Sequence, residues 1–222
     1  MTTQLVSGIG MTSQRTRDRL VQRLRDAGIK NEQVLAVMAS IPRHLFVDEA
    51  LSHRAYEDTP LPIGHGQTIS QPYTVARMTE ILLGEQPRLG RVLEVGTGCG
   101  YQSAVLSQFV DQVYSVERIE PLYAKARNRL YDLKYRNVSC SLSDGSWGLP
   151  EKGPFEGILV AAAPEQVPQA LKEQLADGGR LVMPVGGRKQ QRLVLITRHG
   201  DNFVTKELED AWFVPFLSGV QR

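Results

Sequence analysis

Apolar residues recur at helical spacing in the first third of the chain. This pattern predicts one helix over residues 15–27, a second between Asn31 and Pro42, and a third over residues 72–84. Residues 1–14 show no periodic apolar pattern, and we expect them to form a loose tail.

From Arg91 onward, short apolar runs alternate with segments of helical periodicity. The predicted strands are residues 92–95, 113–117, 138–142, 155–163, 180–185 and 192–198, and the predicted helices are residues 101–110, 121–133 and 166–175. Such alternation is typical of an α/β fold with a doubly wound, mostly parallel sheet that is covered on both faces. We interpret residues 1–222 as a single domain. Residues 91–222 form its α/β core and C-terminal strands, and residues 15–84 form an N-terminal helical extension with a loop.

That loop occupies residues 56–71. Its prolines and glycines exclude a regular helix, but apolar side chains are interleaved with them. We therefore expect an ordered loop rather than a flexible linker.

The composition excludes several classes of function. The chain carries 26 Lys and Arg against 24 Asp and Glu, a balance too even to predict binding to nucleic acid or to an anionic membrane. The apolar run Ile158–Ala163 is far too short to cross a bilayer. The N-terminus lacks the apolar segment of a signal peptide, which favours a cytoplasmic protein. The only cysteines, Cys99 and Cys140, and four scattered histidines match no metal site or disulfide framework, and no obligate protein partner is indicated.

A glycine-rich segment follows the first predicted strand of the core. Ligands of open α/β sheets bind at the carboxyl ends of the strands, where glycines let the backbone approach them. The spacing is GxGxG rather than the GxGxxG of dinucleotide folds, and Glu94 precedes it, placed to orient the ammonium group of a bound amino acid. The residues expected to bind the cofactor here are Glu94, Gly96, Thr97, Gly98, Cys99 and Gly100. We interpret Cys99 as a small contact residue and not as a nucleophile, because no basic partner is evident.

Further acidic residues follow the next two strands. Glu117 ends the second strand, where its carboxylate can accept hydrogen bonds from both ribose hydroxyls. Asp144 and Gly145 follow the third strand and are expected at the adenine edge. Together these residues form the class I S-adenosylmethionine methyltransferase pattern, with S-adenosylmethionine as the cofactor and no metal.

The segment after the fourth strand narrows the choice of methyl acceptor. Ala161–Pro164 offers no polar side chain to hold an amino nitrogen and no aromatic ring to stack a flipped base. A carboxylate acceptor explains this lack, because it is already anionic at neutral pH and needs no general base. Its reaction with a sulfonium methyl is favoured by excluding water and aligning the reacting atoms. Thr68–Pro72 can supply hydrogen-bond donors at the start of a helix.

Several segments resemble the protein-L-isoaspartate O-methyltransferase family. The most diagnostic is the loop Asp58–Pro72, with the sequence DTPLPIGHGQTISQP. The other similar segments are Ile41–Val47, Val92–Tyr101, Ala162–Pro164, Gly178–Gly186 and Phe213–Pro215.

The resemblance implies an enzyme that methylates the free α-carboxylate of L-isoaspartyl residues in damaged proteins and peptides, releasing S-adenosyl-L-homocysteine. It identifies Ser70 as the catalytic residue that donates to this carboxylate, a role compatible with an N-cap hydroxyl. It implies that Ser70, Gln71 and the backbone of Val214 bind the substrate, and that Thr68 and Ile69 contact the cofactor. The ester would then favour succinimide formation and the return of some chains to normal aspartate.

Some residues depart from the family pattern. Glu156 stands where the fourth strand often begins with Asp, which should keep the acid but alter its reach. Phe216–Val220 is more apolar than expected of a peptide-binding edge. His65 lies in the diagnostic loop, where we expect it to pack and not to act as a base.

Three alternatives remain open from the sequence. They are a methyltransferase for small molecules or nucleic acid on the same fold, a nicotinamide-dependent oxidoreductase, and a binding module without activity. The GxGxG spacing disfavours the second, and the presence of Glu94, Glu117, Asp144 and Ser70 disfavours the third.

Overall fold

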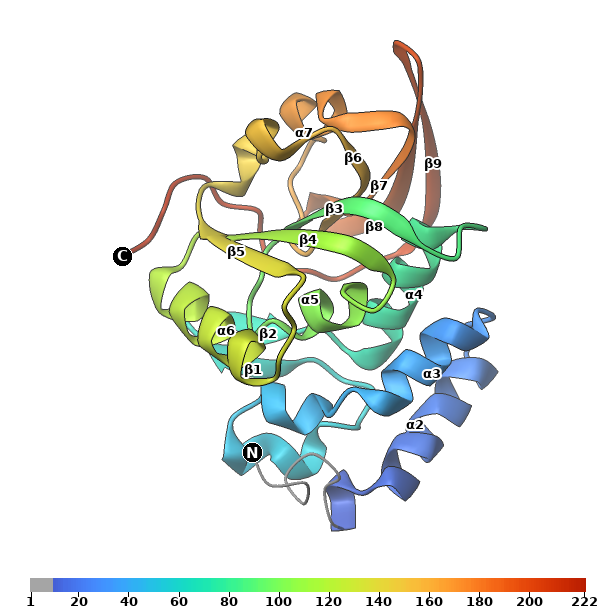
Figure 1. The fold of residues 1–222 in the computed structure, drawn as a ribbon, viewed down its shortest axis with the longest axis vertical. Coiled ribbons are helices and arrows are strands. Elements are labelled where there is room, and N and C mark those ends of the chain that lie inside the picture. Colours follow the sequence, from blue (N-terminus) through green and yellow to red (C-terminus); the bar gives the residue numbers. More distant parts are fainter. Residues whose placement is uncertain (1–9) are drawn as a thin grey trace.

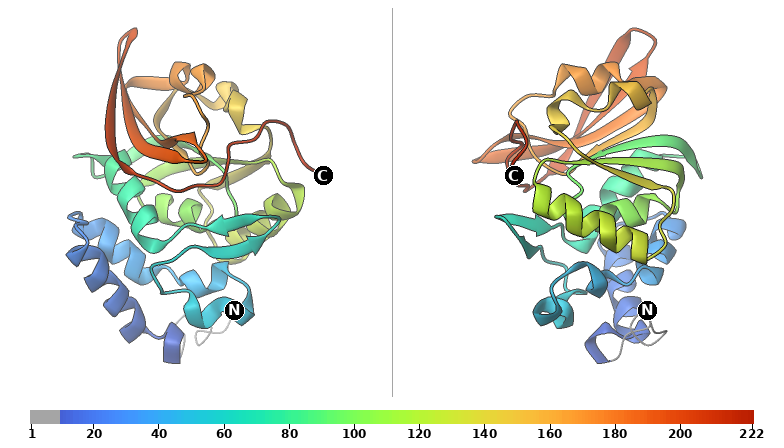
Figure 2. Two further views of the ribbon diagram at one scale, coloured as in Figure 1. Left: turned by 180° about the vertical axis from the view of Figure 1, so that it is seen from behind. Right: turned by 60° about the vertical axis from the view of Figure 1, so that its left-hand side comes forward.

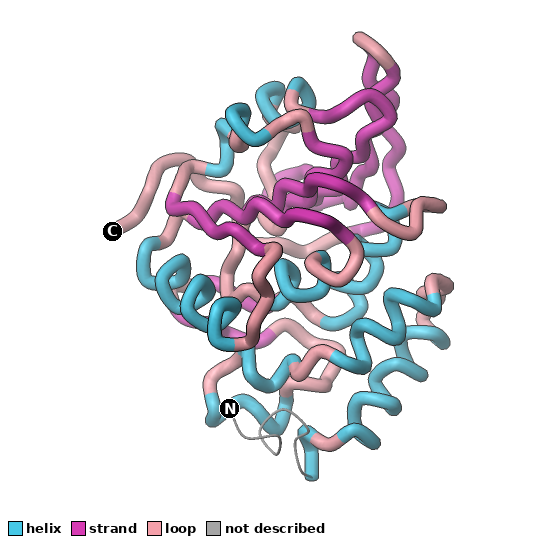
Figure 3. Tube along the Cα trace, in the orientation of Figure 1, coloured by secondary structure: helices cyan, strands magenta, loops and turns pink. Residues whose placement is uncertain are grey.

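A computed structural model describes residues 10–222 and contains a seven-stranded sheet with the order β5-β4-β3-β6-β7-β8-β9 (Figures 1 and 3). The strands are β3 (Leu89–Val95), β4 (Val110–Glu117), β5 (Val138–Leu142), β6 (Phe155–Val160), β7 (Leu175–Gly187), β8 (Gln190–His199) and β9 (Asn202–Asp210). The pairs from β5 to β7 are parallel, whereas β8 and β9 are added antiparallel. The prediction of a doubly wound, mostly parallel α/β sheet is confirmed.

The sheet is covered by helices on both faces. In Figure 1, α4 (Pro72–Leu83), α5 (Tyr101–Leu106) and α6 (Glu120–Asp132) lie on one side of the sheet, and α7 (Gln169–Glu173) lies on the other. Each face has its own hydrophobic cluster, with Leu82 in the first and Leu171 in the second. The central strands β3 and β6 are buried on both faces, which explains their nearly continuous apolar sequences.

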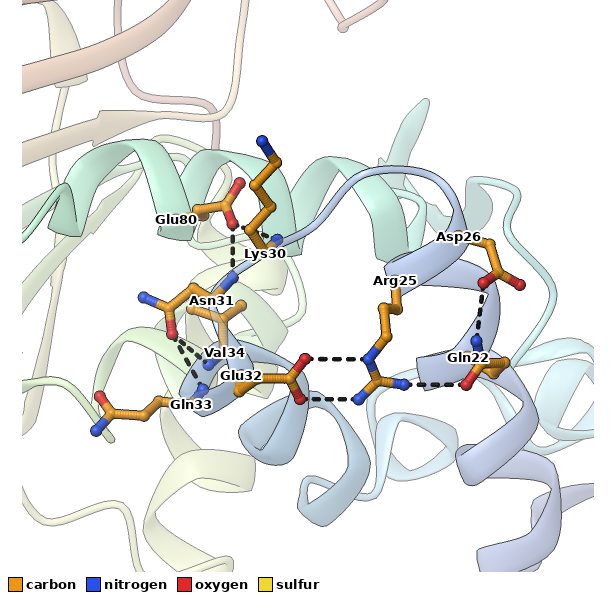
Figure 4. Close-up of polar contacts among 9 residues, drawn as sticks. All are labelled: Gln22, Arg25, Asp26, Lys30, Asn31, Glu32, Gln33, Val34 and Glu80. Atoms are coloured by element: carbon orange, nitrogen blue, oxygen red, sulfur yellow. Dashed lines mark hydrogen bonds and ion pairs between the residues drawn. The ribbon is translucent and has the colours of Figure 1, made fainter.

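The N-terminal extension forms an additional helical layer against α4. It contains α2 (Gln14–Asp26) and α3 (Glu32–Ser40), followed by short 3₁₀ helices at Arg43–Phe46 and Glu49–Arg54. Figure 4 shows how this layer is fixed. The Asn31 side chain caps α3 by accepting from two backbone N–H groups, and the Glu80 carboxylate on α4 accepts from the N–H groups of Lys30 and Asn31.

Several boundaries differ from the sequence-based expectation, since β3, β4, β7 and β8 all begin earlier than predicted and β6 ends at Val160. Residues 10–14, expected in the tail, form a 3₁₀ helix (Gly10–Thr12) and the start of α2, while residues 1–9 lie outside the described part of the chain. The helix expected over residues 101–110 ends at Leu106, because β4 already begins at Val110. The helix expected over residues 166–175 is shortened to α7, because β7 begins at Leu175. Two further 3₁₀ helices, Gly145–Trp147 and Pro150–Lys152, precede β6.

The segment expected as a loop contains a hairpin of β1 (Leu61–Gly64) and β2 (Gln67–Ile69). Its turn residues His65 and Gly66 have φ angles of 53° and 69°, as a tight two-residue hairpin turn requires. His65 is exposed in this turn, so the expected packing role is wrong. The hairpin ends directly before Ser70 and α4 and thereby fixes where Ser70 lies.

The chain after β9 crosses the carboxyl ends of the parallel strands as a C-terminal strap, Phe213–Gln221, drawn in red in Figure 2. It forms isolated bridges to Ala163, after β6, and to Ile119, after β4. Phe216 packs against the second hydrophobic cluster. This packing accounts for Phe216, whereas the other apolar residues of the segment, Leu217 and Val220, are exposed.

Glu156 also has a structural role. Its carboxylate accepts a hydrogen bond of 2.9 Å from the backbone N–H of Gly90. This contact joins the beginning of β6 to the beginning of β3, at the edge of the sheet opposite the pocket.

Candidate active site

A pocket opens where the strand order reverses between β3 and β6, at the carboxyl ends of β3, β4 and β6. Ligands of doubly wound sheets bind at this position. The lining residues come from the glycine loop, the ends of β4 and β6, the hairpin, α4 and the C-terminal strap. Of the predicted site residues, those that line it are Thr68, Ile69, Ser70, Gly96, Thr97, Gly98, Cys99, Glu117, Gly145 and Val214.

The glycine loop joins β3 to α5. Gly96, Gly98 and Gly100 have φ angles of 96°, 55° and 89°, a region that side-chain-bearing residues rarely adopt. Gly98 also leaves little room, since a Cβ atom there would lie 3.3 Å from the Ile63 side chain. Gly100 begins α5 and lies behind the pocket wall. The loop therefore presents backbone to whatever the pocket holds.

Glu117 is the acid of the pocket. Its Oε2 accepts from the N–H of Gly98 at 2.8 Å, and its Oε1 accepts from the N–H groups of Arg118 and Ile119 at 2.8 and 3.0 Å. A carboxylate oxygen has two acceptor positions, so Oε2 keeps one position for a ligand hydroxyl. Both hydroxyls of a ribose could donate to this carboxylate only if one of them replaced a backbone N–H group as a donor to Oε1.

Glu94 lies behind the pocket and is completely buried. Its Oε2 accepts from the hydroxyls of Ser103 and Ser115, whereas its Oε1 has no partner among the described residues. Burial raises the pKa of Glu94 to about 7, and the nearby Glu117 carboxylate acts in the same direction. The carboxyl group is thus an unsatisfied acceptor that titrates near neutral pH.

Asp144 faces the strap and not the pocket. Its carboxylate accepts from the N–H and hydroxyl of Ser146 and, at 2.6 Å, from the N–H of Gly219. Partial desolvation is outweighed by these hydrogen bonds, which lower the pKa of Asp144. The neighbouring Gly145 does line the pocket, and a Cβ atom there would lie 2.2 Å from the Val95 side chain.

Thr97 and Cys99 complete the loop. The Thr97 hydroxyl is paired with that of Ser115 at 2.6 Å. Burial raises the pKa of the Cys99 thiol, which keeps it neutral and supports a contact role over a nucleophilic one.

Ser70 lies between the hairpin and α4, at the pocket wall. Within residues 10–222 its hydroxyl makes no hydrogen bond, so it is available to a ligand. The expected N-cap role is wrong. Gln71 occupies the cap position without a side-chain bond, and Asp58 instead accepts from the N–H of Tyr73 in the first turn of α4. Gln71 itself lines a neighbouring cavity.

Arg43 supports Ser70 from behind and was not predicted as a site residue. It is fully buried, and its Nη2 and Nε donate to the carbonyl oxygens of Ser70 and Ala55, each at 2.8 Å. Its guanidinium carbon lies 4.8 Å from the centre of the Tyr101 ring. Its only sequence signal was its place in the segment Ile41–Val47.

The strap covers the pocket with Phe213–Leu217. The Gln191 side chain holds it by accepting from the N–H of Phe213 at 2.7 Å and donating to its carbonyl at 3.1 Å. The carbonyl of Val214 accepts from the N–H of Ala163, so the Val214 N–H is the main-chain group left for a substrate. Gln191 carried no recognisable signal in the sequence, and for Phe216 and Leu217 the only signal was the unexpectedly apolar segment Phe216–Val220.

The pocket has an apolar wall, and its lining carboxylate, that of Glu117, already accepts from three backbone N–H groups. Ala161, Ala162, Val75 and Met78 form the wall, and none of the described lining residues is a histidine or lysine. Within residues 10–222, no group of three His, Cys, Asp or Glu side chains is placed to hold a metal ion. Over the same residues, no helix has both the length and the apolarity needed to span a bilayer.

A family model described as protein-L-isoaspartate(D-aspartate) O-methyltransferase matches residues 15–221. The chain is 59% identical over 224 residues to the protein-L-isoaspartate O-methyltransferase of Cellvibrio japonicus and 61% identical over 222 residues to protein-L-isoaspartate O-methyltransferase 1 of Marinobacter nauticus. Both alignments cover each chain completely. Among solved structures, a putative Plasmodium falciparum protein-L-isoaspartate O-methyltransferase in complex with S-adenosyl-L-homocysteine is 26% identical. It has a TM-score of 0.76, and the alignment covers 90% of this chain and 98% of that one.

Proposed function

The chain belongs to the protein-L-isoaspartate(D-aspartate) O-methyltransferase family, and we propose that it methylates the free α-carboxylate of L-isoaspartyl residues in damaged proteins and peptides. One structural observation supports this acceptor above all others. The pocket offers an unpaired hydroxyl and an apolar wall, and its described lining includes no histidine or lysine to act as a base, which suits an acceptor that arrives already ionised.

The pocket residues fit S-adenosylmethionine, which when bound supplies an electrophilic methyl group on a sulfonium. Backbone at Gly96 and Gly98 allows close approach, and the free position on Glu117 Oε2 suits a ribose hydroxyl. The unpaired Oε1 of Glu94 is the atom that would attract the ammonium group. Thr68, Ile69, Thr97, Cys99 and Gly145 would form the rest of the cofactor surface.

In the proposed mechanism, Ser70 donates to one oxygen of the substrate carboxylate and leaves the other oxygen free to attack. The bound cofactor would supply its methyl group to that free oxygen, with the electron pair of the carbon–sulfur bond left on sulfur. Opposite charges are consumed, so a dry site favours the step. The Ala161–Ala162 wall and Phe216 exclude water, and the Val214 N–H holds the substrate main chain.

An isoaspartyl residue routes the main chain through its side-chain carbon and leaves its α-carboxylate free. A site that holds carboxylate and main chain together therefore recognises this damage in many sequence contexts. The carbonyl of the methyl ester is more electrophilic than that of the carboxylate, so the next backbone nitrogen attacks it and methanol leaves. The resulting succinimide hydrolyses and returns some chains to aspartate. We place the enzyme in the cytoplasm, a location that its two free thiols, Cys99 and Cys140, suit.

The test uses methyl-labelled S-adenosylmethionine and two synthetic peptides that differ only in Asp or isoAsp at one position. We expect base-labile label on the isoAsp peptide alone. Label on both peptides, or on neither while S-adenosyl-L-homocysteine still raises the melting temperature, would overturn the proposed acceptor and leave the cofactor site standing.

A further inference from the structure

A second cavity lies beside the reaction pocket. It is lined by Gln71 and the beginning of α4, by Leu193 of β8, and by the end of β9 with the residues that follow it. Its volume of about 110 Å³ would hold several water molecules, so it is large enough for the end of a long side chain.

The two cavities are adjacent. Phe213 lines both, and the consecutive residues Ser70 and Gln71 line the first and the second, respectively. Consecutive residues of an extended peptide are about 3.5 Å apart. A peptide whose isoaspartyl carboxylate reaches Ser70 therefore brings a neighbouring side chain to the second cavity.

The charges of the second cavity favour a cation. Arg77 is its one lining cation among the described residues, and it is held by two carboxylates, those of Glu80 at 2.8 Å and Glu209 at 3.3 Å. Glu80 also accepts from the backbone N–H groups of Lys30 and Asn31, which fixes its carboxylate (Figure 4). Asp210 adds a further carboxylate. It forms an ion pair of 2.7 Å with Arg192, which does not line the cavity.

Glu209 has acceptor capacity to spare. Its two polar contacts are both long, 3.3 Å to Arg77 and 3.4 Å to the Tyr73 hydroxyl. Charge-assisted hydrogen bonds of good geometry are about 2.7–2.9 Å long, so neither contact uses the carboxylate fully. A third donor placed in the cavity would improve its coordination.

Aromatic side chains form the remaining wall. Tyr73, Trp212 and Phe213 line the cavity, and Trp212 is 75% exposed. A large exposed aromatic residue at the edge of a cavity marks a surface for contact with another molecule. Aromatic faces attract ammonium and guanidinium groups, particularly beside a carboxylate.

We propose that this cavity is a specificity subsite that binds a lysine or arginine side chain next to the isoaspartyl residue of the substrate, through Glu209 and Trp212. The proposal rests on the proposed function, because the cavity is defined relative to a carboxylate held at Ser70. The enzyme then methylates damage faster where a basic residue flanks it.

The test uses the full-length enzyme and two series of isoAsp hexapeptides. In each series, Lys, Ala or Glu occupies the position directly before or directly after isoAsp. The specificity constant kcat/KM is measured with labelled cofactor at low and high salt, and peptide Kd is measured by calorimetry in the presence of S-adenosyl-L-homocysteine. The variants are Glu209→Gln and, as a matched control, Glu207→Gln. Glu207 lies on the same strand but outside the cavity, with 70% of its side chain exposed.

In one of the two series, we expect kcat/KM for the Lys peptide to exceed kcat/KM for the Glu peptide by about three- to tenfold. This is the effect of a partly exposed ion pair with an aromatic contribution. Salt should reduce this ratio, and Glu209→Gln should bring it close to one while Glu207→Gln preserves it. Equal constants for Lys, Ala and Glu in both series, or a ratio unchanged in Glu209→Gln, would overturn the subsite. If no isoAsp peptide is methylated at all, the proposed function fails. In that case the peptide Kd values test the subsite separately. Tighter binding of the Lys peptide than of the Glu peptide, lost in Glu209→Gln, would support it, and its absence would overturn it.

Discussion

The Nη2 atom of Arg43 lies 2.8 Å from the carbonyl oxygen of Ser70, so a fully buried cation supports the residue that presents its hydroxyl to the pocket. No carboxylate is paired with this guanidinium. It is held by two carbonyl oxygens and by the face of the Tyr101 ring. These contacts fix the Ser70 backbone but offset only part of the cost of burying the charge, because Nη1 has no hydrogen-bond partner among the described residues and burial lowers the pKa of Arg43.

The first prediction concerns this support. Arg43→Lys keeps the charge but cannot donate to both carbonyl oxygens in the same geometry. One buried carbonyl loses its partner, and we expect the free energy of unfolding to fall by about 1–3 kcal/mol. The peptide KM should rise by a larger factor than the cofactor KM. Urea unfolding and steady-state kinetics measure these effects, with the exposed Arg54→Lys as the control. Unchanged stability and kinetics in Arg43→Lys would remove the residue from any supporting role.

The second prediction concerns the Ser70 hydroxyl. Ser70→Ala should leave the affinity for S-adenosyl-L-homocysteine nearly unchanged and lower kcat/KM for an isoAsp peptide by about 10- to 100-fold, the value of one hydrogen bond to a charged group. Ser70→Thr retains the hydroxyl and should recover part of the activity. Equal turnover in Ser70→Ala and the unmodified enzyme would exclude Ser70 from the mechanism.

The third prediction tests the position of the cofactor. Gly98→Val combines a left-handed φ of 55° with a Cβ atom only 3.3 Å from Ile63, and should abolish the rise in melting temperature caused by S-adenosyl-L-homocysteine. Gly200→Val is the control, because Gly200 has a φ of 59° in a turn between β8 and β9 with open space around it. Tight binding retained in Gly98→Val would show that the cofactor lies elsewhere.

The fourth prediction follows from the raised pKa of Glu94, about 7. A carboxyl group with a higher pKa in the folded protein stabilises the fold while it is protonated. This contribution is present below the unfolded pKa of about 4 and is lost as the pH rises to about 7. Glu94→Gln cannot titrate. The free energy of unfolding of Glu94→Gln minus that of the unmodified protein should therefore rise by about 3 kcal/mol between pH 4 and pH 8. Urea unfolding of both proteins measures this difference.

Glu94 should also make cofactor affinity depend on pH, with affinity increasing as the pH rises while the stabilising contribution of Glu94 decreases. If ionised Glu94 attracts the ammonium group, affinity for S-adenosyl-L-homocysteine should rise between pH 6 and pH 7.5 in the unmodified enzyme and stay flat in Glu94→Gln. Titration of the ligand's own amine affects both proteins equally, so the comparison isolates Glu94. Parallel pH profiles would leave Glu94 a purely structural acid.

The fifth prediction concerns the attachment of the strap. Asp144→Ala removes the acceptor for the Gly219 N–H and should accelerate dissociation of bound S-adenosyl-L-homocysteine about tenfold, the value of one charge-assisted hydrogen bond. Stopped-flow displacement measures the rate, and Ser218→Ala serves as a control on the same segment. An unchanged rate would mean that the strap does not limit exit from the pocket.

The sheet could be predicted from the sequence because its strands are buried on both faces and therefore read as apolar runs, as in Ile158–Val160. Strand β9 could not, since it is an edge strand with mostly exposed and charged residues, Asn202–Asp210. The hairpin of β1 and β2 was also missed. The two-residue turn at His65 and Gly66 was its only local signal, and Pro62 argued against a strand.

For the site, local motifs were informative and distant contacts were not. The glycine loop after β3 and Glu117 at the end of β4 meet in one pocket because parallel strands share one carboxyl edge. Asp144 was expected at the ligand, but it binds the backbone of Gly219, 75 residues away in the chain. A contact of that length depends on the path of the strap, which no pattern within the segment itself specifies.

The strap has a consequence for the order in which the protein is made. Every other wall of the pocket precedes Phe213 in the chain, so a ribosome synthesises the sheet, the glycine loop and Ser70 before the roof. At about 5–20 residues per second, β3 is complete several seconds before Leu217 is added. Until Phe213–Leu217 has been added, a nascent chain therefore lacks the part of the pocket wall that the strap supplies.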